Sequence, residues 1–271
     1  MIGEKKMSRN IKSDIVVIKV GTSTLTYDTG KLNFKRLDIL SRVISDIKNS
    51  GKKVVLVSSG AIGVGMSKLN MQKKPDSVKE KQAIAAVGQC ELMSIYDRLF
   101  AEYGTVVAQI LLTKDAITNK ERRLNATNTL STLIEKDIVP IVNENDSVST
   151  DEIKIGDNDT LSANVSELVG ADILIILSDI DGLYNDNPKT NPDAKIIREV
   201  NKITEEIESM ASGAGTSRGT GGMITKISAA KIANKCNTDV VIANGSDPHI
   251  IYDILSGEDV GTIFYGGLNN E

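Results

Sequence analysis

Histidine is almost absent from this chain of 271 residues, since His249 is the only one. It lies at an expected helix start, where a surface or capping role is the simpler interpretation. A Ser-His-Asp hydrolase, a Cys-His protease and a metal centre built on histidine are therefore disfavoured. The same absence favours a reaction that needs no base, such as phosphoryl transfer to a carboxylate that is already ionised at neutral pH.

Cysteine is also scarce, and the chain lacks long apolar runs and an excess of positive charge. Cys90 and Cys236 are far apart and outside any C-x-x-C pattern, so we expect no disulfide or zinc site and a reducing, cytoplasmic compartment. No apolar run approaches the ~20 residues that span a bilayer, and the polar start of the chain lacks the apolar region of a secretory signal. The formal net charge is −4, so neither nucleic acid nor a membrane is an expected partner.

Two common nucleotide-binding motifs are missing as well. The sequence contains no G-x-x-x-x-G-K-[ST], which excludes a P-loop protein, and no G-x-G-x-x-G, so a dinucleotide site has no support. Any phosphate site in this chain must be assembled from several loops.

Apolar, β-branched runs alternate with helical patterns along the chain. The runs predict strands near 14–20, 53–58, 105–112, 138–143, 172–178 and 239–243. Apolar residues at helical spacing predict helices over 33–50, 78–103, 120–136, 159–169 and 222–236, and Asp247 and Pro248 are expected to cap and open a last helix. This alternation predicts an α/β fold in which a mainly parallel central sheet is sandwiched between helices.

Five polar, glycine-marked turns each follow a predicted strand or open a predicted helix. They are VIKVGTST (17–24), VVLVSSGAIGVG (54–65), IVNENDSV (141–148), ILIILSDIDGLYNDNP (173–188) and GTGGMITKISAAKIA (219–233). The carboxyl edge of a parallel sheet is where such folds bind ligands. Lys19 and Lys226 lie near glycines in two of these turns, which points to a site that handles phosphate. The glycine-rich segment 211–222 leads directly into a helix, so a mobile active-site loop is expected there.

Taken singly, these residues keep simpler explanations. Lys19 could be a lysine at a strand end, and Lys226 an exposed helical lysine. Asp159 could be a helix cap. The remaining polar residues of the five turns could be ordinary turn residues.

Taken together and in order, seven segments resemble the amino acid kinase superfamily, and within it the glutamate 5-kinases. The segments are VIKVGTST, SSGAIGVG, RRLNATNTL, NEND, IKIGDNDTLSA, LSDIDGLYNDNP and GTGGMITK. The resemblance runs from about residue 13 to residue 265. It implies an amino acid kinase-like fold and ATP-dependent phosphorylation of the γ-carboxylate of L-glutamate, the first step of proline synthesis. Many members carry a C-terminal PUA domain, and the short form without it is expected here.

The resemblance also implies a domain organisation. A polar extension over 1–12 would precede one kinase domain over 13–271. A substrate-side lobe, about 13–170, and a nucleotide-side lobe, about 171–271, would share one sheet.

The resemblance assigns roles to particular residues. Lys19 and Lys226 would flank the transferred phosphoryl group, and Asp159 would pair with both lysines. The amino acid would be bound by Ser59, Gly60, Ala61, Asp146 and Asn158. The nucleotide would contact Ser178, Asp179, Thr220, Gly221, Gly222 and Met223 as well as the two lysines. Mg²⁺ would bridge the phosphates of ATP without a dedicated set of protein ligands.

Proline as a feedback inhibitor, a downstream glutamyl-phosphate reductase and self-association are further expectations from the resemblance. Two alternatives stay open. The first is a kinase of the same fold that acts on N-acetylglutamate, aspartate, carbamate or a nucleotide, although Asp146 would have no use opposite an acetylated amine. The second is a non-catalytic sensor, which need not keep Lys19, Asp159 and Lys226 together.

Overall fold

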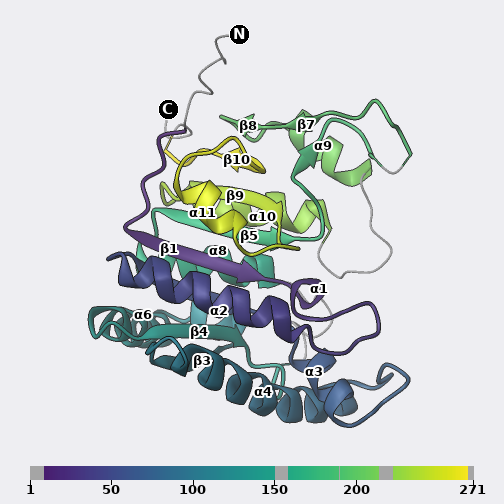
Figure 1. The fold of residues 1–271 in the computed structure, drawn as a ribbon. Helices are drawn as coiled ribbons and strands as arrows, with labels where there is room; N and C mark the ends of the chain where they lie inside the picture. Colours follow the sequence, from purple (N-terminus) through teal and green to yellow (C-terminus); the bar gives the residue numbers. More distant parts are fainter. Residues whose placement is uncertain (1–8, 150–157, 189, 214–221, 268–271) are drawn as a thin grey trace.

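The computed structural model describes residues 9–149, 158–188, 190–213 and 222–267. Its centre is an eight-stranded sheet in the order β3-β4-β2-β1-β5-β9-β10-β8 (Figure 1). The six strands from β3 to β9 are parallel to their neighbours, β10 is antiparallel to β9, and β8 is parallel to β10. The strands are β1 (Ile15–Val20), β2 (Lys53–Ser58), β3 (Val107–Leu112), β4 (Val139–Glu144), β5 (Ile173–Ser178), β8 (Glu199–Val200), β9 (Asp239–Asn244) and β10 (Thr262–Phe264).

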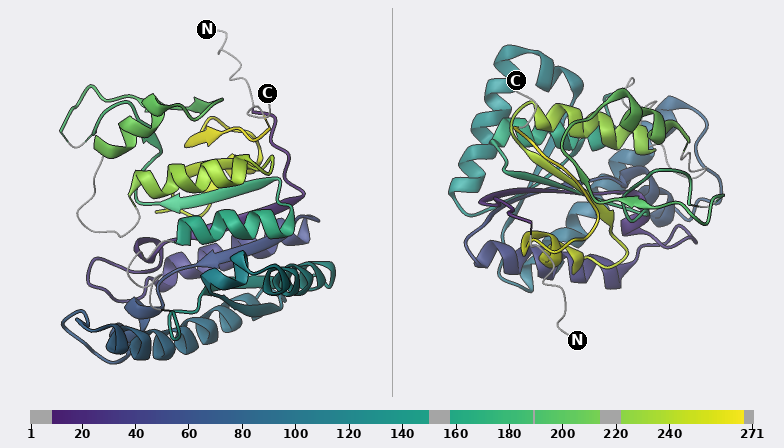
Figure 2. Two further views of the ribbon diagram at one scale, coloured as in Figure 1. Left: turned by 180° about the vertical axis from the view of Figure 1, so that it is seen from behind. Right: turned by 90° about the horizontal axis from the view of Figure 1, so that it is seen from above.

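Helices cover both faces of the sheet, and each face has its own hydrophobic core. One core packs against α2 (Phe34–Asn49), α4 (Val78–Ala101) and α11 (Ile250–Leu255). The other packs against α6 (Lys120–Glu135), α8 (Asn158–Val169) and α10 (Met223–Asn234), which lie nearest the viewer when the molecule is seen from behind (Figure 2). Shorter elements are α1 (Thr22–Leu25), α3 (Ala61–Lys68), α5 (Lys114–Thr118), α9 (Glu205–Gly213), β6 (Leu183–Tyr184) and β7 (Ile196–Ile197).

The predicted α/β fold is confirmed, and the six predicted strands match observed strands to within two residues at each end. Most helices also match, because their caps follow local rules: the Asn33 side chain accepts from the Arg36 N–H, and Ser77 forms a capping box with Glu80. Among the described residues no helix is both long enough and apolar enough to cross a membrane. The division into two lobes stays a prediction.

The predicted last helix is present, but its predicted start was wrong. Asp247 and Pro248 lie in the turn before α11, whose N-cap is His249. The Asp247 carboxylate accepts from the backbone N–H of His249 at 3.0 Å, so it closes the turn before the helix begins. Several elements were not predicted at all, among them α3, α9 and the small β6–β7 sheet.

Helices α3 and α4 pack with their backbones in direct contact, and this packing positions the turn after β2. A Cβ atom added to Gly88 of α4 would overlap the carbonyl oxygen of Ala61, and one added to Gly65 of α3 would overlap the carbonyl oxygen of Ile84. Only glycine fits at either position. The contact therefore fixes α3 and, with it, the turn formed by Ser59 and Gly60.

We expect Gly88→Ala to lower stability by about 1–3 kcal/mol or more, because the two helices must move apart to accept one methyl group. Urea unfolding measures this change. Gly63→Ala in α3 is the matched control, since its Cβ would meet only the movable Thr22 methyl group, at 3.3 Å. Equal stability of the two variants would contradict the proposed backbone contact.

Candidate functional site

The carboxyl ends of five parallel strands meet at one edge of the sheet. The register pairs Val20 of β1 with Ser58 of β2 and Leu177 of β5, and Ser178 of β5 with Asn244 of β9. Because β4 also runs parallel to β2, the turns that follow these strands all open on the same edge. Four of the five glycine-marked turns follow one of these strands, and the fifth leads into α10.

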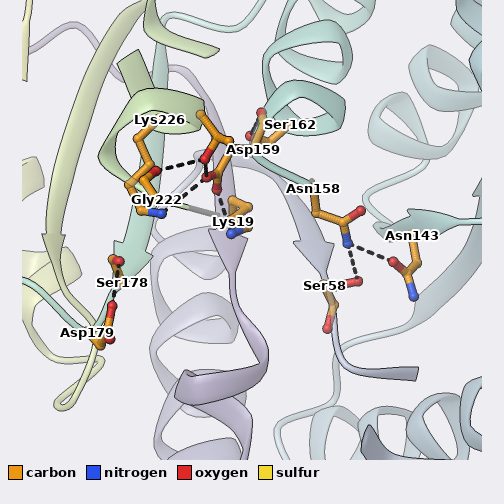
Figure 3. Close-up of polar contacts among 11 residues, drawn as sticks. Lys19, Ser58, Asn143, Asn158, Asp159, Ser162, Ser178, Asp179, Gly222 and Lys226 are labelled. Atoms are coloured by element: carbon orange, nitrogen blue, oxygen red, sulfur yellow. Dashed lines mark hydrogen bonds and ion pairs between the residues drawn. The ribbon is translucent and has the colours of Figure 1, made fainter. Parts of the chain in front are cut away.

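Lys19 reaches the site because side chains alternate along β1. Val16, Ile18 and Val20 point into the core on the α2 side, so Val17 and Lys19 point to the side of α8 and α10. There Lys19 and Lys226, which lies in the first turns of α10, both contact Asp159, in the first turn of α8. The Nζ atom of Lys19 lies 2.6 Å from Oδ1 of Asp159, and that of Lys226 lies 3.2 Å from Oδ2 (Figure 3).

This charge triad of Lys19, Asp159 and Lys226 is almost completely buried. The exposed fractions are 7% for Lys19, 0% for Asp159 and 4% for Lys226. Burial by itself raises the pKa of the Asp159 carboxyl, but the two ammonium groups and the hydrogen bonds from Lys19 and Thr225 outweigh it and lower the pKa to about 2. Two ammonium groups share one carboxylate, so the triad has the composition of an anion site.

Further hydrogen bonds hold Asp159 in place. The Thr225 hydroxyl donates to Asp159 Oδ2 at 2.8 Å, and the Ser162 hydroxyl donates to the Asp159 backbone carbonyl at 2.6 Å. Asp159 is therefore a member of the first turn of α8 whose carboxylate is turned toward α10, and not merely a helix cap. Sequence reasoning missed Thr225, although it lies inside the GTGGMITK segment.

The turn after β2 carries Ser59, Gly60 and Ala61 to this edge. Gly60 has φ of +103°, a left-handed conformation that suits glycine, and it is the N-cap of α3. Ser59 is half-buried beside it. Asp146 is also half-buried and lies in the turn that follows β4, at the same edge of the sheet. The roles predicted for these four residues in binding an amino acid stay predictions.

Asn158 lies beside Asp159 but faces the β2–β4 side of the site (Figure 3). Its Nδ2 atom donates to the Ser58 carbonyl at 3.2 Å and to Asn143 Oδ1 at 2.8 Å. Sequence reasoning missed Asn143 as an individual residue, although it opens the NEND segment at the end of a buried strand. The site therefore has a charged half around Lys19 and a half rich in amides around Asn158.

Ser178 and Asp179 lie on the opposite side of the charge triad from Asn158, at the end of β5 (Figure 3). The Ser178 hydroxyl donates to the Asp179 carboxylate at 3.2 Å. Gly222 is the N-cap of α10 and has no side chain with which to bond the first N–H groups of the helix, including that of Met223. Thr220 and Gly221, which were also predicted to contact the nucleotide, lie outside the described residues.

Within the described ranges, no group of three or more His, Cys, Asp and Glu residues could hold a metal ion. Lys19 and Lys226 occupy the space around the Asp159 carboxylate. A divalent cation that accompanies a phosphate ligand would fit this site as a partner of the phosphate oxygens rather than of a protein ligand set.

Comparisons with known proteins identify related chains. A model of the amino acid kinase family matches residues 14–244. The glutamate 5-kinase of Clostridium perfringens is 60% identical over 253 residues, which are 92% of this chain and 94% of that protein. That of Clostridium tetani is 52% identical over 96% of this chain and 97% of that protein. In Thermoanaerobacter sp. strain X514 the match is 53% identical over 92% of this chain but 67% of that protein, so the relatives differ in length.

Solved structures give the same fold at much lower identity. Carbamate kinase from Giardia lamblia bound to AMP-PNP has a TM-score of 0.67 at 17% identity and covers 94% of this chain and 99% of its own. UMP kinase from Bacillus anthracis has a TM-score of 0.63 at 18% identity, with coverages of 94% and 97%. At such identities these likenesses support the fold alone.

The lowered pKa of Asp159 predicts that its carboxyl stays ionised down to about pH 2. The stability that this group contributes is then fully present at pH values above its ordinary pKa of 3.8. It is lost as the pH falls through the lowered pKa. Carboxyl ¹³C NMR of aspartate-labelled protein, with Asp159→Asn used for assignment, should show no titration of this signal between pH 3.5 and 7.

Asp239 is the control for this titration. Burial is the largest cause that raises the pKa of its carboxyl, and the charge of Asp172 adds to it. A hydrogen bond from the Gly266 N–H lowers the pKa but does not outweigh the two, so the Asp239 signal should titrate above the ordinary range. An Asp159 signal that moves with the Asp239 signal would contradict the ionised triad.

Proposed function

The chain belongs to the amino acid kinase family and, within it, to the glutamate 5-kinases, and on that premise we propose that it transfers the γ-phosphoryl group of ATP to the γ-carboxylate of L-glutamate. The product is L-glutamyl 5-phosphate, an acyl phosphate. The observation that supports this proposal most strongly is the buried charge triad of Lys19, Asp159 and Lys226 at the carboxyl edge of the sheet.

The triad suits the electrostatics of phosphoryl transfer. As the γ-phosphoryl group moves from the nucleotide to the acceptor, negative charge spreads over its oxygens and must be stabilised. Lys19 comes from β1 and Lys226 from α10, so their ammonium groups approach Asp159 from two different elements. Because Asp159 holds both groups in place before the reaction, little reorganisation is needed when the charge develops.

The proposed reaction needs no general base. The γ-carboxyl group of glutamate has a free pKa of about 4.3 and is ionised at neutral pH, so no proton has to leave it. With its pKa lowered to about 2, Asp159 is also a poor proton acceptor at that pH. Mg²⁺, when bound on the phosphates of ATP, would neutralise charge and orient the β- and γ-phosphates.

The two sides of the triad suit the two substrates. We assign the ATP side to Ser178, Asp179 and the start of α10, where helix N–H groups suit phosphate oxygens. We assign the glutamate side to the turn at Ser59 and Gly60, with Asp146 and Asn158. A carboxylate such as Asp146 is the natural partner of a free α-ammonium group, which favours glutamate over an N-acetylated acceptor.

Proline as an inhibitor, assembly into oligomers and transfer of the product to a reductase remain parts of this proposal. An acyl phosphate hydrolyses readily, so an enzyme that consumes it promptly is chemically reasonable.

A panel of acceptors tests the proposal. We expect ADP release from Mg-ATP with glutamate, and an acyl hydroxamate when hydroxylamine is added, while N-acetylglutamate, aspartate, carbamate and UMP give background rates. A faster reaction with any of the other acceptors would replace the assignment to glutamate.

Lys19→Ala and Lys226→Ala should each lower kcat by about 10²–10³, the usual cost of one preorganised donor to the transition state. Steady-state rates with saturating ATP and glutamate measure the effect. Lys231→Ala is a control on the same helix as Lys226, because Lys231 forms a surface ion pair with Glu208. Near-normal turnover by Lys226→Ala would rule out its proposed role.

Asp146→Asn should raise the KM for glutamate about 10–100-fold and leave the KM for ATP little changed, because it removes a charge-assisted bond to the α-ammonium group. Initial rates with each substrate varied in turn provide both constants. If the KM for ATP rises instead, the two sides of the site have been assigned in reverse.

A further inference from the structure

Helix α4 carries two buried polar side chains on a face that is otherwise apolar. Gln89 and Tyr96 are seven residues apart, or two helical turns, so they lie on the same side of the helix. Gln89 Oε1 accepts from Asn143 Nδ2, at the end of β4, at 2.8 Å. The Tyr96 hydroxyl bonds the Ser58 hydroxyl, at the end of β2, at 2.9 Å. Helix α4 thus bonds to the ends of both strands that lead into the glutamate side of the site.

The bond from Gln89 begins a chain of three buried amides, Gln89, Asn143 and Asn158. Asn143 Oδ1 accepts from the Glu144 backbone N–H at 2.8 Å and from Asn158 Nδ2 at 2.8 Å. Asn158 Nδ2 also donates to the Ser58 carbonyl (Figure 3). A backbone N–H can only donate and a backbone carbonyl can only accept, so these two bonds fix which way Asn143 and Asn158 are turned.

Both N–H bonds of the Asn158 side chain are therefore used inside the protein. No hydrogen bond to its Oδ1 is found among the described residues. The atom left for a ligand is an acceptor, which suits the N–H groups of an ammonium. A flipped amide would present its own N–H groups to that cation and lose the contact.

The orientation of the Gln89 amide that allows its bond to Asn143 has a cost at the other end of the amide. Its Nε2 atom is buried and has no partner in the described part of the chain, while its Oε1 is used by Asn143. A buried donor without a partner costs free energy. Turning the amide would leave Asn143 Nδ2 facing another donor, so this orientation preserves the amide chain.

Resting on the proposed function, we propose that Gln89 is a positioning residue for the amino-acid substrate. It acts through Asn143 and holds the Asn158 amide with its oxygen toward the substrate ammonium. Gln89 itself belongs to α4, outside the turns that form the site.

The test is a double-mutant cycle on steady-state constants. Gln89→Met keeps the volume of the side chain and removes its amide, and Asn143→Leu does the same for its partner. We expect Gln89→Met to raise the KM for glutamate about 3–10-fold, the range for one net hydrogen bond, with the KM for ATP unchanged. In the Asn143→Leu background the same change should have no further effect, since Gln89 acts only through Asn143.

Thr105→Val is the matched control. It removes another buried hydrogen bond between side chains, from Thr105 to Ser45 at 2.9 Å, in the loop that follows α4. It should lower the unfolding midpoint without changing either KM. If Gln89→Met does not fold, Gln89→Asn replaces it, because the shorter amide stays polar but does not reach Asn143.

The outcomes separate this inference from the function on which it rests. Additive effects in the cycle, an unchanged KM for glutamate, or an equal rise in the KM for ATP would each overturn the role of Gln89 and leave the kinase activity in place. Wild-type protein that gives no acyl phosphate from glutamate would overturn the proposed function itself.

Discussion

The site depends on one buried carboxylate that is shared by two ammonium groups. Asp159 has no exposed surface, and without Lys19 and Lys226 its charge would be costly to bury. The converse also holds, because each lysine needs a counter-charge at this depth. The three residues come from β1, α8 and α10, so their attraction joins the centre of the sheet to the two helices that cover one of its faces. The proposed phosphate chemistry and the packing of this face therefore depend on the same contacts.

Around that centre, the two faces of the sheet contribute different groups to the site. The face of α8 and α10 supplies charge, and the face of α3 and α4 supplies shape and fixed amides. Asn158 and Asp159 are adjacent in sequence at the start of α8, yet one bonds toward β2 and β4 and the other toward β1 and α10. A single helix start thus contributes to both halves of the site, the amide-rich half proposed for the acceptor and the charge triad.

Much of the fold could be predicted from the sequence, since β-branched runs and capped amphipathic helices are local signals. Helix α3 was not predicted, because Gly60, Gly63 and Gly65 are unfavourable in a helix. Packing against α4 stabilises it instead. Lys19, Asp159 and Lys226 were found through their turns and the family resemblance. Gln89, Tyr96 and Thr225 were not, because each has a partner more than thirty residues away, and a lone polar residue on an apolar helix face carries no local sign of that partner.

The crossing of α3 and α4 at Gly65 and Gly88 has a consequence for how this protein can move. Where two helices meet through side chains, rotamer changes absorb small displacements. At Gly65 and Gly88 the backbone of one helix lies against the backbone of the other, and neither glycine has a side chain that could rearrange. Any shift of the turn at Ser59 and Gly60 must carry α3 and the start of α4 with it as one rigid body. Adjustment of this turn to an amino acid would then take the form of a small rotation of the helix pair rather than a movement of the turn alone.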